Sequence, residues 1–581
     1  MPTIDVNYTE LQRLLNLKLD NNVEKLDDIL AYIKAEIKDF DPKENSLSIE
    51  MKDTARADLW SVEGLTRALQ SYTGQQKGLK PYITADKSDI EVNVDANLFD
   101  IRPYIACAVI KDIHLSDDVI KGIMHLQDKL DHTHGRSRRR TSIGIYNLDL
   151  INPPIKYTAV KPTTVEFVPL GFNQKMQLDE ILEKHPKGQE YGHIVKSHPL
   201  YPMLYDSQDH VLSFPPIINS SDLGKITEDS RNLLIEVTGT LHKTVLNTLT
   251  LITSALIDRG GKAYSVTINY PQGTNYTQKT LVTPDFNNKP LELSITETNR
   301  LLGLNLSAEV IINLLGIAGL GVEKVSDQYI TVLVPCYRVD VMHQVDIIED
   351  IAIAYGYNNI EPLWCELPTT GKAKADQYCI DIARDLMIGL GYQEVLNTTL
   401  TNPQTLFQKM NQPPTRLIEL SNPKVITMTC LRNQLLPGLI EFLSCNQSVE
   451  FPQKIFELGR VTLPNDAEET RTCDKNYLSA VTTHSNANFS EIKSTLDAFM
   501  TNFGVEWQIQ ETTHPSFIDG RAGKILTENQ EVGIIGEINP ATLEAWKLEN
   551  PVAGFELHFQ TLVDDKQNEP CKKLAKQTSC P

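Results

Sequence analysis

The sequence predicts an α+β multidomain fold built from several compact domains. Its 581 residues exceed what a single hydrophobic core supports. Apolar residues make up 41% of the chain and charged residues 22%, which is typical of folded globular proteins and excludes a disordered or fibrous chain. Runs with the period of a strand alternate with runs that have the period of a helix along most of the length, so each domain should combine both kinds of element.

Two domains are predicted in the first half of the chain. Residues 1–80 begin with the strand-like TIDVN, continue with a helix from Tyr8 to about Leu17, and form a small αβ domain. Residues 90–280 alternate strand-like runs with helical ones, which predicts a mixed α/β domain. Inside it, the segment that starts at Tyr191 is rich in Pro, Ser and His and is long for a connector, so we treat it as a candidate for a site.

Two further domains and a tail complete the predicted organisation. Residues 281–358 contain two helices separated by a glycine-rich break, followed by the strand YITVLVP, which predicts a small winged-helix-like αβ domain. Residues 360–560 alternate strands and helices in an antiparallel pattern, which predicts one domain around an antiparallel sheet. The polar residues 561–581 show no periodicity, and we expect them to be disordered.

Charge and cysteine content exclude several classes of protein. The net charge of −20 argues against a surface that binds nucleic acid everywhere, so any RNA contact must be local. The one dense basic run, Arg136 with Arg138 to Arg140, is either a phosphate contact or a solvated loop. The chain lacks an apolar stretch of membrane-spanning length and a secretion signal, and its nine cysteines are scattered. We therefore expect a cytoplasmic protein with reduced thiols.

Four acidic residues form a distinctive local pattern. Asp346, Glu349 and Asp350 share one face of a predicted helix that starts near Val345, and Asp340 lies on the loop before it. Neighbouring carboxylates repel one another, and Mg²⁺, which prefers oxygen ligands, relieves that repulsion. On spacing alone, a solvated acidic helix face is the more common explanation.

The residues around this cluster resemble one known family. The segment RVDVMHQVDIIEDIAIAYGYNNI, from Arg338 to Ile360, resembles the metal-bearing segment of the phenylalanyl-tRNA synthetase β subunit. Further motifs run in the family's order from about Ala55 to Leu557: RADLWSVEGLTRAL, SFPPIINS with NLLIEVTGT, LRNQLLPGLIEFL, KIFELG, GRAGKI, IGEINP and PVAGFEL. The length and the motif SFPPIIN are similar to the archaeal and eukaryotic cytosolic type.

This resemblance implies a set of ligands and partners. It implies that Asp340, Asp346, Glu349 and Asp350 bind Mg²⁺. The implied partner is the α subunit of an α₂β₂ heterotetramer, which attaches phenylalanine to tRNA(Phe) with ATP. Residues 360–560 then form a class II synthetase-like domain without catalysis, because Arg432 lacks the accompanying motifs of a nucleotide site, as does Arg460. We expect these two to be ordinary surface arginines and the synthetic site to lie on α.

The resemblance also implies a hydrolytic activity in residues 90–280, which resemble the family's editing domain. Such a domain removes tyrosine esterified by mistake, because a phenylalanine pocket rejects one extra hydroxyl poorly. Glu236 is the candidate for recognising the tyrosine hydroxyl, and an exposed strand glutamate is the nearly equal alternative. The residues expected to position the ester or the water are His198, Ser213, Asn219 and Thr238.

Two alternatives from other classes remain open at this point. The domains could form a non-enzymatic RNA-binding or assembly scaffold in which the acidic cluster is structural. Alternatively, residues 90–280 could act alone as a freestanding aminoacyl-tRNA deacylase. Complex formation with an α chain separates these alternatives from the β-subunit hypothesis.

Overall fold

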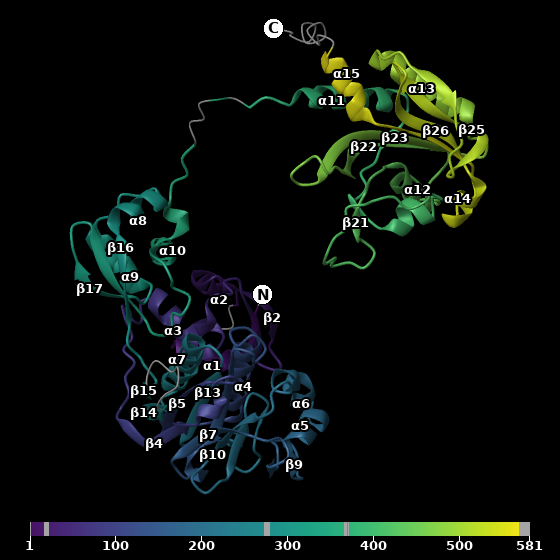
Figure 1. Ribbon diagram of the computed structural model, residues 1–581. Coiled ribbons are helices and arrows are strands. Elements are labelled where there is room, and N and C mark those ends of the chain that lie inside the picture. Colours follow the sequence, from purple (N-terminus) through teal and green to yellow (C-terminus); the bar gives the residue numbers. More distant parts are fainter. Residues whose placement is uncertain (1, 17–22, 272–278, 365–368, 370, 569–581) are drawn as a thin grey trace. The chain divides into compact units, whose positions relative to one another are not determined.

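The chain divides into two compact units (Figure 1). The computed structural model describes residues 2–16, 23–271, 279–364, 369 and 371–568. The first unit is Met1–Leu363 and the second is Trp364–Pro581. This division falls close to residue 360, where the sequence predicts the start of the last domain. No helix in the described part of the chain is long and apolar enough to cross a membrane.

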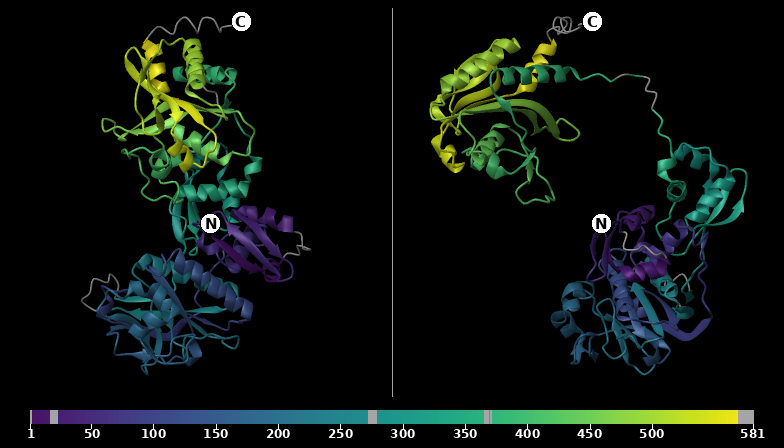
Figure 2. Two further views of the ribbon diagram at one scale, coloured as in Figure 1. Left: turned by 90° about the vertical axis from the view of Figure 1, so that its right-hand side faces the viewer. Right: turned by 180° about the vertical axis from the view of Figure 1, so that it is seen from behind.

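The N-terminal elements form a small antiparallel sheet with helices, coloured purple in Figure 2. Strand order is β1-β3-β2. Asn7 caps α1 and Ser61 caps α3, and each accepts a hydrogen bond from a backbone N–H of the first turn. Leu11 and Leu65 are fully buried, as the helical spacing predicts. The elements are β1 (Thr3–Asn7), α1 (Tyr8–Leu15), α2 (Val23–Leu30), β2 (Ala35–Asp41), β3 (Ser46–Met51) and α3 (Val62–Tyr72).

A ten-stranded mixed sheet dominates the first unit. Its order is β12-β11-β10-β7-β4-β14-β5-β13-β6, with β15 paired to β14, and only the pairs β14–β4 and β4–β7 are parallel. The strands are β4 (Lys87–Val94), β5 (Tyr104–Lys111), β6 (Thr141–Asn147), β7 (Ile155–Val160), β10 (Tyr201–Tyr205), β11 (Val211–Phe214), β12 (Ile218–Asn219), β13 (Leu233–Gly239), β14 (Lys262–Asn269) and β15 (Thr280–Thr283). The central strands β5 and β13 are almost wholly buried, which explains their continuous apolar runs.

Helices cover this sheet, and a segment predicted as a connector belongs to it. Helix α7 packs on β5 and β13, and α4 packs on β6. The segment from Tyr191 onward contributes β10, β11 and β12, so its interpretation as a long connector was wrong. Its aromatic side chains pack with α5 and α6 in a core of their own. The remaining elements are α4 (Asp117–His132), β8 (Glu166–Phe167), β9 (Met176–Gln177), α5 (Leu178–Lys184), α6 (Pro186–Tyr191) and α7 (His242–Asp258).

A three-stranded sheet with three helices completes the first unit. Strand order is β16-β18-β17, and the core combines the sheet with one face of each helix. The helices predicted on either side of the glycine-rich break are both present, and the acidic helix starts one residue before the predicted Val345. The elements are β16 (Lys289–Ser294), α8 (Ile295–Leu302), α9 (Ala308–Ile317), β17 (Gly321–Val325), β18 (Tyr329–Val334) and α10 (Gln344–Tyr355).

The second unit is built on a seven-stranded sheet that is antiparallel except for the pair β19–β22. Its order is β19-β22-β23-β27-β26-β25-β24, with α11, α13 and α15 on one face and α12 and α14 on the other (Figure 1). Helix α15 continues into the predicted tail, and residues 569–581 lie outside the described residues. The elements are α11 (Ala375–Gly389), β19 (Gln393–Glu394), β20 (Leu400–Thr401), β21 (Cys430–Leu431), α12 (Leu436–Cys445), β22 (Gln453–Pro464), β23 (Thr472–Thr483), α13 (Phe489–Phe503), β24 (Gln508–Glu511), β25 (Phe517–Thr527), β26 (Gln530–Ile538), α14 (Pro540–Ala545), β27 (Val552–Leu557) and α15 (Phe559–Asn568).

Candidate functional site

Side chains bridge the two ends of the ten-stranded sheet. Strand β6 stands at one end and β12 at the other. The hydroxyl of Tyr146 on β6 lies 2.8 Å from Ser213 Oγ on β11. Asn219 on β12 donates from Nδ2 to the carbonyl oxygen of Ile145 at 3.4 Å. These contacts bring the sheet ends together and define the place where a cavity forms.

A cavity of about 330 Å³ lies at this junction, between α4, β6 and the turn that joins β11 to β12. Most of its wall is apolar, supplied by isoleucines of α4 and β6 and by the turn. A few polar groups converge on it, which is the usual composition of a ligand site. The polar lining residues are Gln127, Asp128, Arg138, Ser142, Lys187, Ser213, Asn219, Lys225 and Glu236.

Glu236 is a buried carboxyl group with one unpaired oxygen in this lining. The side chain sits in the middle of β13 and is 2% exposed. Oε2 accepts a hydrogen bond from the Tyr146 hydroxyl at 2.8 Å, whereas Oε1 has no hydrogen-bond partner. Burial raises the pKa of Glu236 to about 7, against the lowering effects of Tyr146, Arg102 and Thr238. A buried carboxylate oxygen without a donor is unfavourable, so a ligand that supplies one gains binding energy.

The structure brings together three of the five residues predicted for editing. Glu236, Ser213 and Asn219 line the cavity. Thr238 is buried two residues along the same strand, and its Oγ1 accepts from Arg102 Nε at 2.9 Å, but it is not part of the lining. His198 is half-buried and lies in a turn before β10, also outside the lining. The alternative of an exposed strand glutamate at Glu236 was wrong.

Two arginines that sequence reasoning did not assign to this site support its walls. Arg102 is buried and donates to the carbonyl oxygen of Thr238 at 2.7 Å and to Ser142 Oγ at 3.0 Å. Arg138 is also buried, pairs with Asp131 at 2.9 Å and donates to carbonyl oxygens of the β11–β12 turn. Of the basic run, Arg138 is therefore a structural group, while Arg136, Arg139 and Arg140 are exposed. Arg102 stands alone in the sequence, so no pattern around it indicates such a role.

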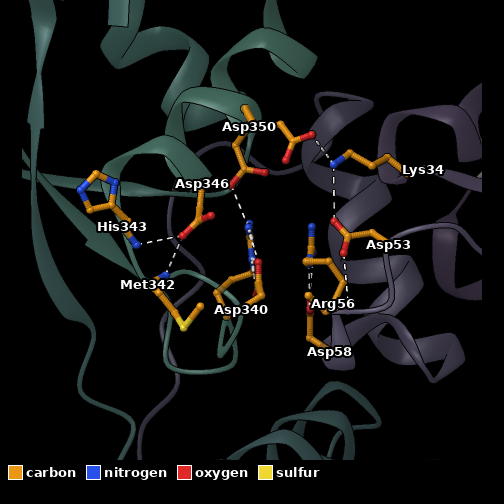
Figure 3. A network of polar contacts seen from close by, with 12 residues as sticks. Lys34, Asp53, Arg56, Asp58, Asp340, Met342, His343, Asp346 and Asp350 are labelled. Atoms are coloured by element: carbon orange, nitrogen blue, oxygen red, sulfur yellow. Dashed lines mark hydrogen bonds and ion pairs between the residues drawn. The ribbon is translucent and has the colours of Figure 1, made fainter. Parts of the chain in front are cut away.

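The four acidic residues of the second candidate site are all engaged by protein groups, and Figure 3 labels three of them, Asp340, Asp346 and Asp350. Buried Arg338 pairs with Asp340 at 2.9 Å and with Asp350 at 2.8 Å. Asp346 Oδ2 accepts two backbone N–H groups at 2.8 Å and so caps α10. Glu349 pairs at 2.5 Å with Lys34, which comes from the N-terminal domain.

The donor chemistry of this cluster suits a hard cation, but its present arrangement does not. All four carboxylates line one cavity of about 230 Å³, together with Lys34 and Arg338. Oxygen ligands of this kind are those that Mg²⁺ prefers. In the described part of the chain, however, no group of three or more His, Cys, Asp or Glu side chains stands in a position to hold a metal ion. Instead of a metal ion, the positive charges of Lys34 and Arg338 neutralise three of these carboxylates.

The C-terminal unit uses its buried charges internally. Arg432 is buried, pairs with Glu457 at 2.6 Å and donates to the carbonyl oxygen of Arg460 at 2.9 Å. Its interpretation as a surface arginine was therefore wrong, whereas Arg460 is exposed. Glu556 accepts the N–H groups of Leu435 and Leu436 at the start of α12, and burial raises its pKa to about 7. The guanidinium of Arg432 is therefore committed to contacts within the protein.

Comparison with known proteins decides the family. The model described as "tRNA synthetase B5 domain" matches residues 291–357, and "Phenylalanyl tRNA synthetase beta chain CLM domain" matches residues 360–559. A phenylalanine-tRNA ligase beta subunit from Pyrococcus furiosus is 41% identical over 97% of this chain and 100% of its own. This chain belongs to the phenylalanine-tRNA ligase beta subunit family. The beta subunit from Archaeoglobus fulgidus is 36% identical over 97% of this chain and 99% of its own.

A solved structure from the same family supports the fold. An N-terminal fragment of the phenylalanyl-tRNA synthetase beta subunit from Pyrococcus horikoshii is 39% identical, with a TM-score of 0.58. It covers 61% of this chain and 100% of the fragment. The predicted membership of the phenylalanine-tRNA ligase beta subunit family is confirmed, as is the α+β multidomain fold. These three relatives come from archaea, in agreement with the predicted type.

Proposed function

We propose that this chain, as a phenylalanine-tRNA ligase β subunit, assembles with an α subunit into an α₂β₂ complex that attaches phenylalanine to tRNA(Phe). The α subunit supplies the ATP site and the synthetic active site. The buried pair of Arg432 with Glu457 supports this division, because it leaves neither side chain available to a nucleotide. The proposed compartment is the cytoplasm, and the nine scattered cysteines of the sequence support it.

A second activity is proposed for the cavity beside β6, namely hydrolysis of tyrosyl-tRNA(Phe). The observation that carries this proposal is the unpaired Oε1 of Glu236 in a cavity that is otherwise mostly apolar. A tyrosine hydroxyl donates a hydrogen bond to this oxygen, whereas a phenylalanine ring leaves it unpaired, so the cavity favours the wrong amino acid. Ser213 and Asn219 are the proposed groups that orient the ester or the attacking water.

Hydrolysis here depends on orientation more than on a strong nucleophile. An aminoacyl ester is already activated, so water held at the carbonyl carbon is sufficient once the side chain is bound. Lys187 and Lys225 belong to the cavity lining and supply positive charge for the RNA end. His198 and Thr238 remain proposals as editing residues, and the buried contact of Thr238 with Arg102 favours a supporting role for it.

Binding of Mg²⁺ by Asp340, Asp346, Glu349 and Asp350 also remains a proposal. Their shared cavity and oxygen chemistry support it. Mg²⁺ would have to compete with Lys34 for Glu349. It would also have to compete with Arg338 for Asp340 and Asp350. Asp346→Ala in the assembled complex should lower both the metal content and the association with α. An unchanged metal content, measured by mass spectrometry of the purified complex, would refute the ligand assignment.

Co-expression with a candidate α chain tests the main proposal. The purified complex should charge tRNA(Phe) with phenylalanine, and the complex should also hydrolyse tyrosyl-tRNA(Phe) added to it. A chain that forms no charging complex with α would contradict the β-subunit role and favour the scaffold alternative. Efficient hydrolysis of tyrosyl-tRNA by the chain without α would favour the freestanding deacylase.

A further inference from the structure

Tyr146 links the carboxyl group of Glu236 to the opposite end of the ten-stranded sheet. Its hydroxyl lies 2.8 Å from Glu236 Oε2 on β13 and 2.8 Å from Ser213 Oγ on β11. Tyr146 itself is fully buried and is not part of the cavity lining. Any influence of this side chain on a bound ligand must therefore act through the two residues that it contacts.

The backbone of β6 leaves space for this contact at one position. Gly144 is the partner of Glu236 across the β6–β13 pair, and Tyr146 follows two residues later on the same face of the strand. A Cβ atom at position 144 would lie 2.3 Å from the Tyr146 hydroxyl and 2.4 Å from Glu236 Oε2. The tyrosine ring therefore reaches back across a glycine, and a side chain there would separate the hydroxyl from the carboxylate.

The hydrogen bonds of Tyr146 decide which carboxylate oxygen is left for a ligand. A tyrosine hydroxyl has one proton to donate, and here it faces two acceptors, Glu236 Oε2 and Ser213 Oγ, each at 2.8 Å. Oε1 of Glu236 is then the oxygen without a partner, in a residue that lines the cavity. If the bond to Tyr146 were lost, the carboxyl group could rotate and satisfy its oxygens elsewhere.

We propose that Tyr146 is a positioning residue for amino-acid discrimination, which holds Glu236 so that its free oxygen meets the hydroxyl of a tyrosyl ester. This inference rests on the proposed editing function of the same cavity. Tyr146 touches neither the ester nor the water, and its contribution to the choice of side chain acts through Glu236. Its loss should weaken binding of tyrosyl esters selectively.

The substitution Tyr146→Phe removes only the hydroxyl and tests this role in the full chain assembled with α. We expect kcat/KM for hydrolysis of tyrosyl-tRNA(Phe) to fall about tenfold, mostly through KM, which is the size of effect expected for one hydrogen bond to a charged group. Hydrolysis of phenylalanyl-tRNA(Phe), which depends on the Ser213 contact but not on the free oxygen of Glu236, should fall much less. Tyr270→Phe is the matched control, because Tyr270 is also buried and donates to the carbonyl oxygen of Ile105 at 3.1 Å, and it should change neither rate.

Two outcomes would overturn the role of Tyr146. One is an unchanged rate of tyrosyl-tRNA(Phe) hydrolysis in Tyr146→Phe. The other is an equal loss of both rates, since a general structural defect would affect both substrates.

The variant Glu236→Gln provides a second, independent test. Because Tyr146 is proposed to act through Glu236, the double variant should discriminate no worse than Glu236→Gln alone. A further tenfold loss in the double variant would contradict the proposal. A wild-type complex that does not hydrolyse tyrosyl-tRNA would instead overturn the editing function. Failure of the editing function can therefore be told apart from failure of the role of Tyr146.

Discussion

The chemistry of Glu236 follows from its place in the sheet. Strand β13 lies between β5 and β6, and all seven of its residues are buried. Burial is the largest influence on this carboxyl group and raises its pKa to about 7, whereas the hydrogen bond from Tyr146 and the charge of Arg102 lower it. Near neutral pH the group is therefore poised between its neutral and charged forms.

Glu236→Gln should change how stability depends on pH. A carboxyl whose pKa is higher in the folded state contributes stability that is fully present below the unfolded value of 4.5 and is lost as pH rises through about 7. The difference corresponds to about 3 kcal/mol at the usual 1.36 kcal/mol per pKa unit. Hydrogen exchange of the β13 amides should show this decline in the wild-type chain and not in Glu236→Gln. Parallel pH profiles for the two proteins would contradict the buried, raised pKa.

At the residue scale, the sequence could predict Glu236 but not its supporting contacts. The run LLIEVTG lacks alternation, which indicates a strand buried on both faces, and a glutamate within it is unusual. Tyr146 lies 90 positions away, and only the folded sheet brings the two together. His198 was predicted because it lies on an element that flanks Glu236 in the editing-like region, and this placement says nothing about the direction of the side chain.

At the element scale, short strands were the hardest to predict. Strands β10, β11 and β12 have five, four and two residues, and prolines interrupt the apolar pattern around them. The long helices α4, α7 and α13 are easier to predict, because their apolar spacing extends over several turns. The class II-like interpretation of the last domain is in agreement with its antiparallel sheet. The burial of Arg432 could not be predicted, because it depends on Glu457, which lies on the separate strand β22.

Arg432→Ala tests whether this arginine is a structural group of β22 or a nucleotide ligand. Removing it leaves Glu457, whose side chain is 1% exposed, without its cationic partner, which should cost about 3–5 kcal/mol of stability. Thermal or urea unfolding of the purified chain would measure this loss. Arg460→Ala is the matched control, because an exposed arginine should cost less than about 0.5 kcal/mol. A stable Arg432→Ala variant with a raised KM for ATP in the complex would contradict this account.

At the scale of the whole chain, ion pairs join the N-terminal domain to α10. The chain has 55 lysines and arginines against 75 aspartates and glutamates, so carboxylates outnumber cations. The positions of Lys34 and Arg338 therefore decide which carboxylates are neutralised. Lys34 pairs with Asp53 at 3.4 Å as well as with Glu349, and it therefore connects two regions far apart in the sequence. The acidic pattern of α10 and the nearby Arg338 were visible in the sequence, but Lys34 lies 315 positions from Glu349, so their pairing was not.

Lys34→Ala and Asp346→Ala should change Mg²⁺ affinity in opposite directions if the acidic cluster binds the ion. Removing Lys34 frees Glu349 and takes away a competing positive charge, so affinity should rise several-fold. Removing the Asp346 carboxylate takes away a ligand, so affinity should fall. Calorimetric titration of the assembled complex with Mg²⁺ measures both effects. Equal affinities in the wild type and the two variants would show that the cluster is held by its protein cations alone.

The most direct test of the proposed editing function is the hydrolysis of tyrosyl-tRNA(Phe) by the complete complex that carries Glu236→Gln. The amide keeps the size of the side chain but removes the buried acidic acceptor that lines the cavity beside β6. Hydrolysis of tyrosyl-tRNA should fall at least tenfold, while the rate of charging with phenylalanine should be unchanged. A Glu236→Gln complex that clears tyrosyl-tRNA at the wild-type rate would contradict it.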